Sequence, residues 1–133
     1  MAGTSPTQRS MALYKKHGYQ CGIVEKFNSN IGPHGIRQDL WGAVDIIAVA
    51  GKHTVGIQAC AASGHGSHVT KLADEPRMFG MLDAGWRVVV LSWKKPGAHS
   101  RRWSWRHTVM TVELMTCERP EPVPHVPVFL TGP

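Results

Sequence analysis

Residues Arg37–Cys60 read RQDLWGAVDIIAVAGKHTVGIQAC, and this stretch decides the fold. It holds two short apolar runs rich in Val and Ile, Ala43–Ala50 and Thr54–Cys60, on either side of Gly51-Lys52. Apolar runs of this length bounded by turn residues predict β-strands. A two-residue Gly-X loop between them predicts a type II′ hairpin turn. We therefore expect an antiparallel hairpin at the centre of the fold.

The register of this hairpin sets an acid opposite an amide. We expect Ala50 to pair with His53 across the turn. Counting away from that pair sets Asp45 opposite Gln58, and the alternation of strand side chains adds Cys60 to their face. An ionised carboxylate in so apolar a strand is costly unless a partner or a metal ion binds it. Asp45 is therefore the leading candidate for a functional residue.

The composition is that of one globular domain with a basic balance. The 133 residues are 42% apolar, and the net charge of +6 favours a polyanionic partner such as nucleic acid. Five of the nine prolines fall in the last 14 residues. We therefore expect a single domain over residues 1–117 and an extended, proline-rich tail over residues 118–133.

Cysteine usage and hydropathy indicate a soluble, intracellular protein. The three cysteines are odd in number and lack paired spacing, which favours neither a disulfide framework nor a cysteine-rich zinc site. No apolar run approaches the roughly 20 residues of a membrane helix, and the N-terminus has no signal-peptide pattern. We expect a reducing cytoplasm and no membrane partner.

Helix and strand signals alternate along the rest of the chain. Ser5-Pro6-Thr7-Gln8 combines an N-cap, a proline for the first turn and a capping-box glutamine, so it predicts a helix start. The run Val88–Leu91 is apolar on both faces, which is typical of a central strand covered by helices on both sides. The order of elements predicts an α/β protein with a central mixed sheet flanked by helices. The other predicted boundaries are helices over Pro6–His17 and from near Ser67 to Gly85 with a break at Pro76, strands over Cys21–Phe27 and Trp86–Trp93, a loop over Asn28–Ile36, and a last strand or hairpin within Arg101–Leu114.

A basic, tryptophan-rich stretch over Trp93–Arg106 follows the central strand. Lysine and arginine side chains neutralise phosphates, whereas an exposed tryptophan stacks on unpaired bases. We expect most of these tryptophans to be packing residues and the cations to face DNA. The predicted DNA-binding residues are Arg37, Lys94, Lys95, Arg101, Arg102 and Arg106.

Three segments carry a resemblance to a known family: KHGY at Lys16–Tyr19, VDIIAV at Val44–Val49 and VGIQAC at Val55–Cys60. Together with the order α-β-β-β-α-β over Ser5–Trp93, they resemble the PD-(D/E)XK nuclease superfamily, in particular its Holliday-junction-resolvase branch and related small phage or bacterial nucleases. The resemblance implies a restriction-endonuclease-like core and Mg²⁺- or Mn²⁺-dependent cleavage of branched DNA. It also implies a homodimer, because symmetric cutting of two strands requires two sites, in the cytoplasm of a bacterium or a phage-infected host cell.

In that family an Asp, a Glu and a carbonyl oxygen hold the metal, and a Lys two residues after the Glu helps to activate water. The resemblance places Asp45 on the metal-binding Asp and Gln58 on the Glu position, where some relatives also have Gln. Ala59 would supply the carbonyl. Cys60 stands at the Lys position, and a thiol cannot do the work of an ammonium group beside a scissile phosphate.

Two roles of the family pattern therefore need other residues. Lys71, expected in the first turns of the next helix, is the candidate for the missing lysine, and its alternative is an exposed helix lysine. Glu25 and Asp39 compete to be the second carboxylate, because the predicted first helix contains no acid. Glu25 is preferred for its place in an apolar row, with a half-exposed edge-strand residue as its alternative. The alternative for Asp39 is a loop ion pair with Arg37, which stabilises little.

Two other functions stay open at this point. A non-catalytic DNA-binding module that kept the nuclease fold accounts for Gln58 and Cys60. A basic structural protein unrelated to nucleases accounts for the charge but leaves Asp45 unexplained. The sequence favours the metal-dependent deoxyribonuclease. Its catalytic candidates are Asp45, Gln58, Lys71 and Glu25, and its metal-ligand candidates are Asp45, Ala59, Gln58 and Glu25.

Overall fold

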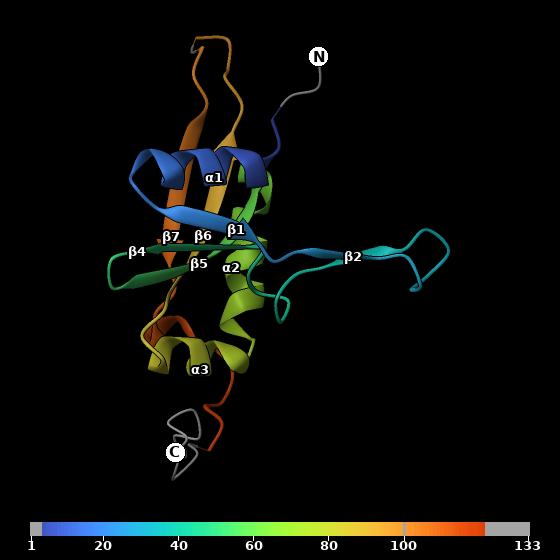
Figure 1. Cartoon of the computed structure of the whole chain (residues 1–133), viewed down its shortest axis with the longest axis vertical. Coiled ribbons are helices and arrows are strands. Elements are labelled where there is room, and N and C mark those ends of the chain that lie inside the picture. The colour runs from blue at the N-terminus through green and yellow to red at the C-terminus, as the bar shows by residue number, and fades with distance from the viewer. Residues whose placement is uncertain (1–3, 100, 122–133) are drawn as a thin grey trace, which may run out of the picture.

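Five strands form one mixed sheet at the centre of the protein. The computed structural model describes residues 4–99 and 101–121, apart from the side chains of Lys26 and Arg37. The elements are α1 Pro6–Lys16, β1 Gln20–Ile23, β2 Lys26–Asn28, β3 Ile36–Gln38, β4 Ile46–Ala50, β5 His53–Ala61, α2 His65–Ala73, α3 Arg77–Asp83, β6 Arg87–Lys94 and β7 Ser104–Val109, with 3₁₀ turns at Ala62–Gly64 and Val112–Leu114. The strand order is β1-β4-β5-β6-β7 (Figure 1). Strands β5 and β6 are parallel, and the other neighbouring pairs are antiparallel.

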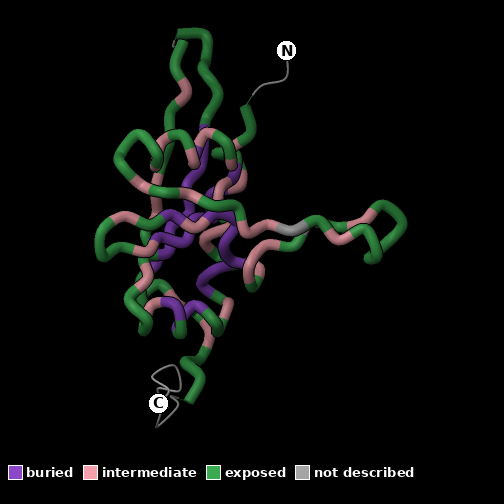
Figure 2. Tube along the Cα trace, in the orientation of Figure 1, coloured by how far each residue is buried: buried purple, intermediate pink, exposed green. Residues whose placement is uncertain are grey.

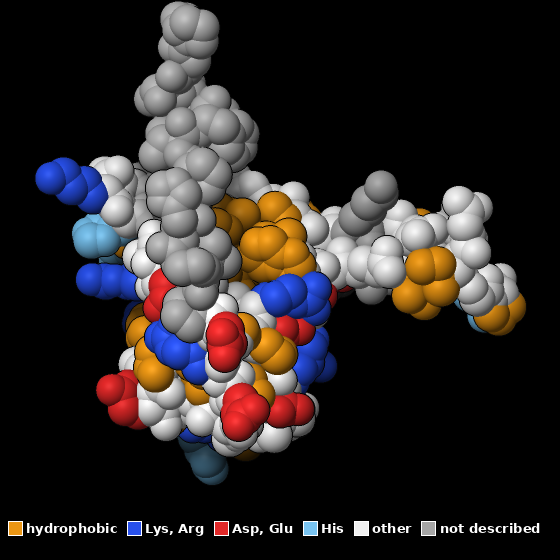
Figure 3. Space-filling model, turned by 90° about the horizontal axis from the view of Figure 1, so that it is seen from below, with side chains coloured by type: hydrophobic (Ala, Val, Ile, Leu, Met, Phe, Trp, Pro, Cys, Tyr) orange, Lys and Arg blue, Asp and Glu red, His pale blue; other side chains and the backbone are white. Residues whose placement is uncertain are grey.

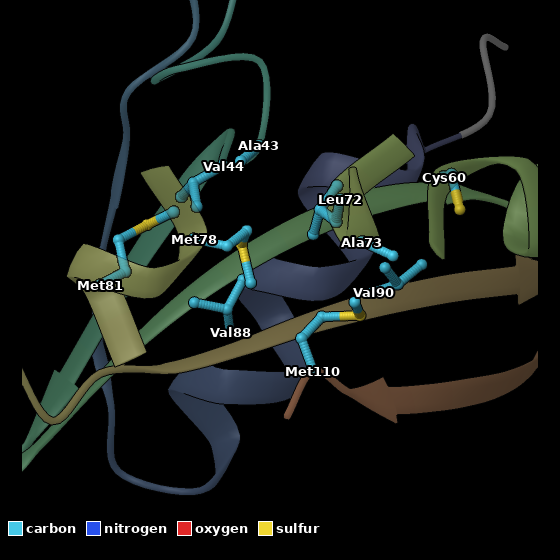
Figure 4. Packing of buried hydrophobic residues seen from close by; sticks show 10 residues of the cluster. All are labelled: Ala43, Val44, Cys60, Leu72, Ala73, Met78, Met81, Val88, Val90 and Met110. Carbon is cyan, nitrogen blue, oxygen red and sulfur yellow. The ribbon is translucent and has the colours of Figure 1, made fainter. Parts of the chain in front are cut away.

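Helices cover both faces of the sheet, so the core has two layers. On one face α1 packs Met11 and Leu13 against a buried cluster that includes Leu91 of β6. On the other face α2 and α3 pack over Val88 and Val90 of the same strand (Figure 4). The buried segments run through the middle of the molecule (Figure 2). The predicted α/β class, with a mixed sheet flanked by helices, is confirmed.

The central hairpin has the predicted register. Ala50 pairs with His53, and the ladder runs back to Ile46 opposite Ile57. Gly51 adopts a φ of 56°, whereas Trp41 is the only non-glycine residue with positive φ in the described part of the chain. A positive φ at the first turn position alone is what a type II′ turn requires.

The predicted strand over Cys21–Phe27 is wrong in its second half. The chain leaves the central sheet after β1, where the N–H of Val24 makes a last bond to the carbonyl oxygen of Asp45 (3.0 Å). Strand β2 pairs with β3 in a separate two-stranded sheet. Pairing across a short connection has replaced pairing with the main sheet.

This separate hairpin, residues 26–38, forms an arm that projects from the body of the protein (Figures 1 and 2). The predicted loop over Asn28–Ile36 is mostly the tip of the arm. The expected apolar row does not face a core, because Ile23 is 54% exposed and Phe27 is 58% exposed.

Helix boundaries lie close to the predicted ones. The capping box at α1 is present: the side chain of Ser5 accepts from the N–H of Gln8, and the Gln8 side chain accepts from the N–H of Ser5. Pro76 separates α2 from α3 as expected. Helix α2 begins at His65 rather than near Ser67, because a 3₁₀ turn leads into it directly from β5.

The end of the described chain lies against α3. Residues 118–121 of the predicted tail are exposed, and Arg119 pairs with Asp83 at 2.6 Å. Residues 122–133, the rest of that prediction, lie outside the described residues. None of the helices in the described part has the length and apolar character needed to cross a membrane.

Candidate functional site

Asp45 and Gln58 meet on one face of the central hairpin. Nε2 of Gln58 donates to Oδ2 of Asp45 at 3.3 Å, and the backbone N–H of Ala59 donates to Oδ1 at 3.2 Å. Asp45 is 6% exposed and Gln58 is 4% exposed. The predicted pairing is confirmed, since a slip of one residue would have set the two side chains on opposite faces.

The environment of Asp45 disfavours its charge. The pKa of this carboxyl is raised from 3.8 to about 7, chiefly by burial. The hydrogen bond from the N–H of Ala59 opposes this rise, and the negative charges of Glu25 and Asp39 add to it. The carboxyl therefore carries its full charge only above neutral pH. A bound cation would favour the ionised form.

Gln58 brings a buried oxygen to the same place. Its Oε1 has no hydrogen-bond partner within the described part of the chain. A buried polar atom left in this way costs about 1–3 kcal/mol, so it calls for an ordered water, an ion or another ligand. Backbone N–H and C=O groups of one strand residue point to the same side, so the Ala59 carbonyl lies on the Asp45 side of β5.

This donor set fits a hard cation such as Mg²⁺, which prefers carboxylate, amide and carbonyl oxygens. The described residues contain no group of three His, Cys, Asp or Glu side chains that could hold a metal ion. The fit therefore depends on the amide of Gln58 and the carbonyl of Ala59 together with the carboxylate of Asp45.

Both candidates for the second carboxylate act on Asp45. Glu25 follows Val24, whose N–H bonds the Asp45 carbonyl oxygen, so Glu25 stands where the arm leaves the sheet. Asp39 lies at the other end of the arm, just after β3. The charge of each contributes to the raised pKa of Asp45, so neither acid is favoured over the other, and among the described residues the three acids form no group that could hold a metal ion by themselves.

Lys71 reaches the site from α2. Its Nζ lies 3.8 Å from Oδ2 of Asp39, so Asp39 is paired with Lys71 in addition to any contact with Arg37, whose side chain is not described. Gly42, at a φ of 64°, lies beside this lysine, since a Cβ there would stand 3.9 Å from the Lys71 Cε, an ordinary van der Waals distance. Lys71 lies in the last turn of α2, not in the first turns as expected, since the helix begins early and ends at Ala73.

Cys60 offers no positive charge in place of a lysine. The thiol is buried on the face that it shares with Gln58, as predicted. Desolvation, together with the charge of Asp45, raises its pKa to about 11. It therefore stays a neutral thiol at physiological pH.

No protein-family model, characterised protein or solved structure matches this chain.

Five of the six predicted DNA-binding cations are exposed around the β6–β7 loop, residues 95–103, whereas Arg37 lies in β3 of the arm. Lys94 ends β6, Arg106 lies in β7, and Lys95, Arg101 and Arg102 lie between them, all exposed. The loop projects beyond the sheet (Figure 1). Strands β5 and β6 are parallel, and Ala59 pairs with Leu91. The loop therefore leaves the sheet at the end where β5 finishes, on the C-terminal side of Gln58. Lys94 lies three residues beyond Leu91, or about 10 Å further along β6.

The tryptophans of this region divide as expected, with one exception. Trp93 is buried and donates from Nε1 to Oγ of Ser10 at 2.9 Å. Trp103 is partly buried beneath the guanidinium of Arg9, which lies 3.6 Å from the ring centroid. Trp105 is 49% exposed and is the tryptophan of this stretch available to a ligand.

Neither His65 nor His68 of α2 was predicted to be a functional residue, because the two form no zinc motif. His68 lies one turn before Lys71, and its Nδ1 is buried without a partner among the described residues. Desolvation and the charge of Lys71 lower its pKa, and Asp39 raises it. The spacing of three residues between His68 and Lys71 sets both on one helix face, which was the available signal. His65 is structural: it bridges Ser92 and Thr108 at 2.6 and 2.7 Å.

Proposed function

We propose that this chain is an Mg²⁺- or Mn²⁺-dependent endonuclease that hydrolyses phosphodiester bonds in branched DNA, built on a restriction-endonuclease-like core over residues 1–117. One observation carries the proposal. A buried carboxylate, Asp45, stands beside Oε1 of Gln58, which has no partner among the described residues, and it feels the charge of Asp39, which is paired with Lys71 at 3.8 Å. Acids and a cation gathered around a half-satisfied amide form a polar centre that packing alone does not require.

The residues divide into ligands and a phosphate-facing cation. Asp45, Gln58 and the Ala59 carbonyl would hold the metal, with Glu25 or Asp39 as a further carboxylate. The metal would supply an activated water and positive charge at the phosphate. Lys71 would stabilise the negative charge that develops on the phosphate oxygens. Cys60 cannot fill this role, because its thiol is neutral.

The basic residues around the β6–β7 loop extend the proposed site toward a DNA backbone. Phosphate contacts by Lys and Arg position a protein on DNA and give its binding a strong salt dependence. The net charge of +6 supports this partner. The proposal includes a homodimer, because a branched junction offers two strands to cut. It also includes a location in the cytoplasm of a bacterium or a phage-infected cell.

A DNA-binding module without catalysis is the second candidate. It is favoured by Cys60, which leaves the third strand without a cation, and by Gln58 in place of an acid. In that case the raised pKa of Asp45 is a property of a neutral, buried carboxyl that never binds metal.

Incubation of the purified chain with four-way, flapped and linear DNA separates the two candidates. Each DNA is tested with Mg²⁺, with Mn²⁺ and with EDTA. The nuclease proposal predicts cleavage of the four-way or flapped DNA with metal and none with EDTA. Binding to branched DNA without cleavage in either metal would assign the chain to the second candidate.

A further inference from the structure

A pocket of about 360 Å³ opens beside the candidate site, and no role has been given to it above. It lies between the segment before β4, helix α3 and the residue before β6. Its volume falls within the range of small-molecule sites, about 300–1,000 Å³. Hydrophobic side chains gather near the base of the arm, next to Lys or Arg side chains, on the face seen in Figure 3. The pocket is lined by Trp41, Arg77, Gly80, Met81, Ala84 and Trp86.

Trp41 is held in an unfavourable backbone conformation at this pocket. Its φ is 56°, a region that bulky side chains rarely adopt. This conformation is disfavoured by about tenfold or more relative to the ordinary right-handed region. Its side chain is 40% exposed, so core packing does not explain the strain. Arg77 donates to the Trp41 carbonyl oxygen at 3.3 Å and is itself held by Glu75 at 2.6 Å. Residues that persist in such conformations cluster at ligand sites.

Trp86, the second tryptophan of the pocket, is partly buried against the core. A Cβ at Gly56 would stand an ordinary 3.6 Å from Trp86 Cε3 but only 2.8 Å from Cγ2 of Val44, so this glycine makes room for the valine. One tryptophan is therefore anchored in the core, and the other is presented at the rim by a restrained backbone.

The pocket and the proposed metal site share one short segment. Trp41 lines the pocket, and a Cβ placed on its neighbour Gly42 would stand 3.9 Å from Cε of Lys71, the lysine whose Nζ lies 3.8 Å from Asp39. A nucleotide whose phosphate lies at Lys71 would therefore have its base within reach of the tryptophans.

We propose that this pocket binds an unpaired nucleobase adjacent to the phosphate that is cut, so that the enzyme selects DNA with single-stranded nucleotides at a branch or flap. The inference rests on the proposed function. Two tryptophans and a mostly apolar lining favour stacking, which accepts any base because every base has a π-face. The cations Lys71 and Arg77 beside the pocket favour a nucleotide over an uncharged apolar segment of a protein.

The test measures DNA binding by the full chain in EDTA, so that cleavage does not enter the result. Trp41→Gly removes the indole and suits the positive φ, so this variant should fold at least as well as the wild type. We expect it to bind flapped DNA about tenfold more weakly and linear duplex unchanged. Trp41→Phe should retain binding to flapped DNA. Leu114→Ala, which truncates an apolar side chain of similar exposure outside the pocket lining (41%, against 40% for Trp41), is the control and should also retain it.

Four outcomes overturn the pocket proposal: a wild type that binds no DNA, unchanged affinity of Trp41→Gly for flapped DNA, an equal loss in Leu114→Ala, or an equal loss on linear duplex. A change of oligomeric state in Trp41→Gly, measured by sedimentation, would instead assign the pocket to a second copy of the chain. The cleavage assay with metal is separate. If the wild type cuts no DNA but its binding of flapped DNA depends on Trp41, the pocket proposal stands and the nuclease proposal fails. If the wild type cuts DNA and Trp41→Gly binds flapped DNA normally, the nuclease proposal stands and the pocket proposal fails.

Discussion

Gln58 gives its amide N–H to the Asp45 carboxylate at 3.3 Å and leaves its own Oε1 buried without a partner among the described residues. The same carboxylate has a pKa raised to about 7, chiefly because it is desolvated. The pair is therefore incomplete on both sides: the acid lacks a positive charge, and the amide oxygen lacks a donor. A cation between them would satisfy both, and the predictions below depend on that reading.

Asp45→Asn should abolish cleavage. The amide keeps the shape of the side chain but removes the charge that would hold the metal, so we expect cleavage of branched DNA to fall by about two orders of magnitude or more. Folding and DNA binding should persist, and binding should improve if Asp45 repels phosphate. Gel-based cleavage assays and thermal unfolding measure the two effects.

Asp83→Asn is the control for this substitution, because Asp83 is an exposed acid paired with Arg119 on α3. It should cleave like the wild type. Normal cleavage by Asp45→Asn would place any nuclease activity elsewhere and leave the central hairpin as scaffold.

Lys71→Ala should slow cleavage strongly if this lysine replaces the one missing at Cys60. We expect a loss of about a hundredfold or more in the single-turnover rate, because a preorganised charge at the phosphate is lost. Cys60→Ser should have little effect, since its thiol is neutral. Lys52→Ala, at the exposed tip of the central hairpin, serves as the control. Equal rates in Lys71→Ala and Lys52→Ala would show that Lys71 is an ordinary surface lysine.

Reversing the charge of Lys94, Lys95, Arg101 and Arg102 should weaken DNA binding and flatten its dependence on salt. Each phosphate contact that is lost releases about one counterion fewer, so the slope of log K against log salt should decrease with each substitution. Lys52→Glu with Arg87→Glu reverses two charges at the opposite end of β5 and β6 and should change the slope much less. If affinity and slope stay unchanged in the quadruple variant, the β6–β7 loop is a solvated surface.

The metal-free protein should lose stability as the pH rises through 7. The pKa of Asp45 is about 7 in the folded state and 3.8 when unperturbed, so the folded state holds this proton more tightly. The stabilisation that protonated Asp45 contributes is fully present below about pH 4 and is lost as the pH rises through the folded pKa. This loss lowers the free energy of unfolding by roughly 4 kcal/mol at most.

Urea unfolding of the wild type and of Asp45→Asn at pH 5 and pH 8 isolates this contribution, because the other titrating groups are common to both. The wild type should lose more stability than the variant between these two values. Mg²⁺ added at pH 8 should restore stability to the wild type and not to Asp45→Asn. The same pH dependence in both proteins would mean that Asp45 is not the titrating group.

Several features of the fold could be predicted because they depend on neighbouring residues. Side-chain alternation and a two-residue turn at Gly51-Lys52 determine which residues oppose one another in the central hairpin. The capping box at Ser5 is a contact within four residues. The break after Ile23 was not predictable in this way, because strand propensity does not say which strand will be the partner. The arm forms where pairing of β2 with β3 replaces pairing with the sheet.

The sequence by itself therefore determined the Asp45–Gln58 pair, since the two residues lie thirteen positions apart in one regular hairpin. Only the tertiary structure decided what surrounds them. Asp39 and Lys71 are 32 residues apart and meet because α2 packs back across β5 and β6. The pKa of Asp45 is likewise a consequence of burial beneath that helix layer. Desolvation and charge pairing depend on distance in space rather than along the chain, so no local pattern of residues could have determined them.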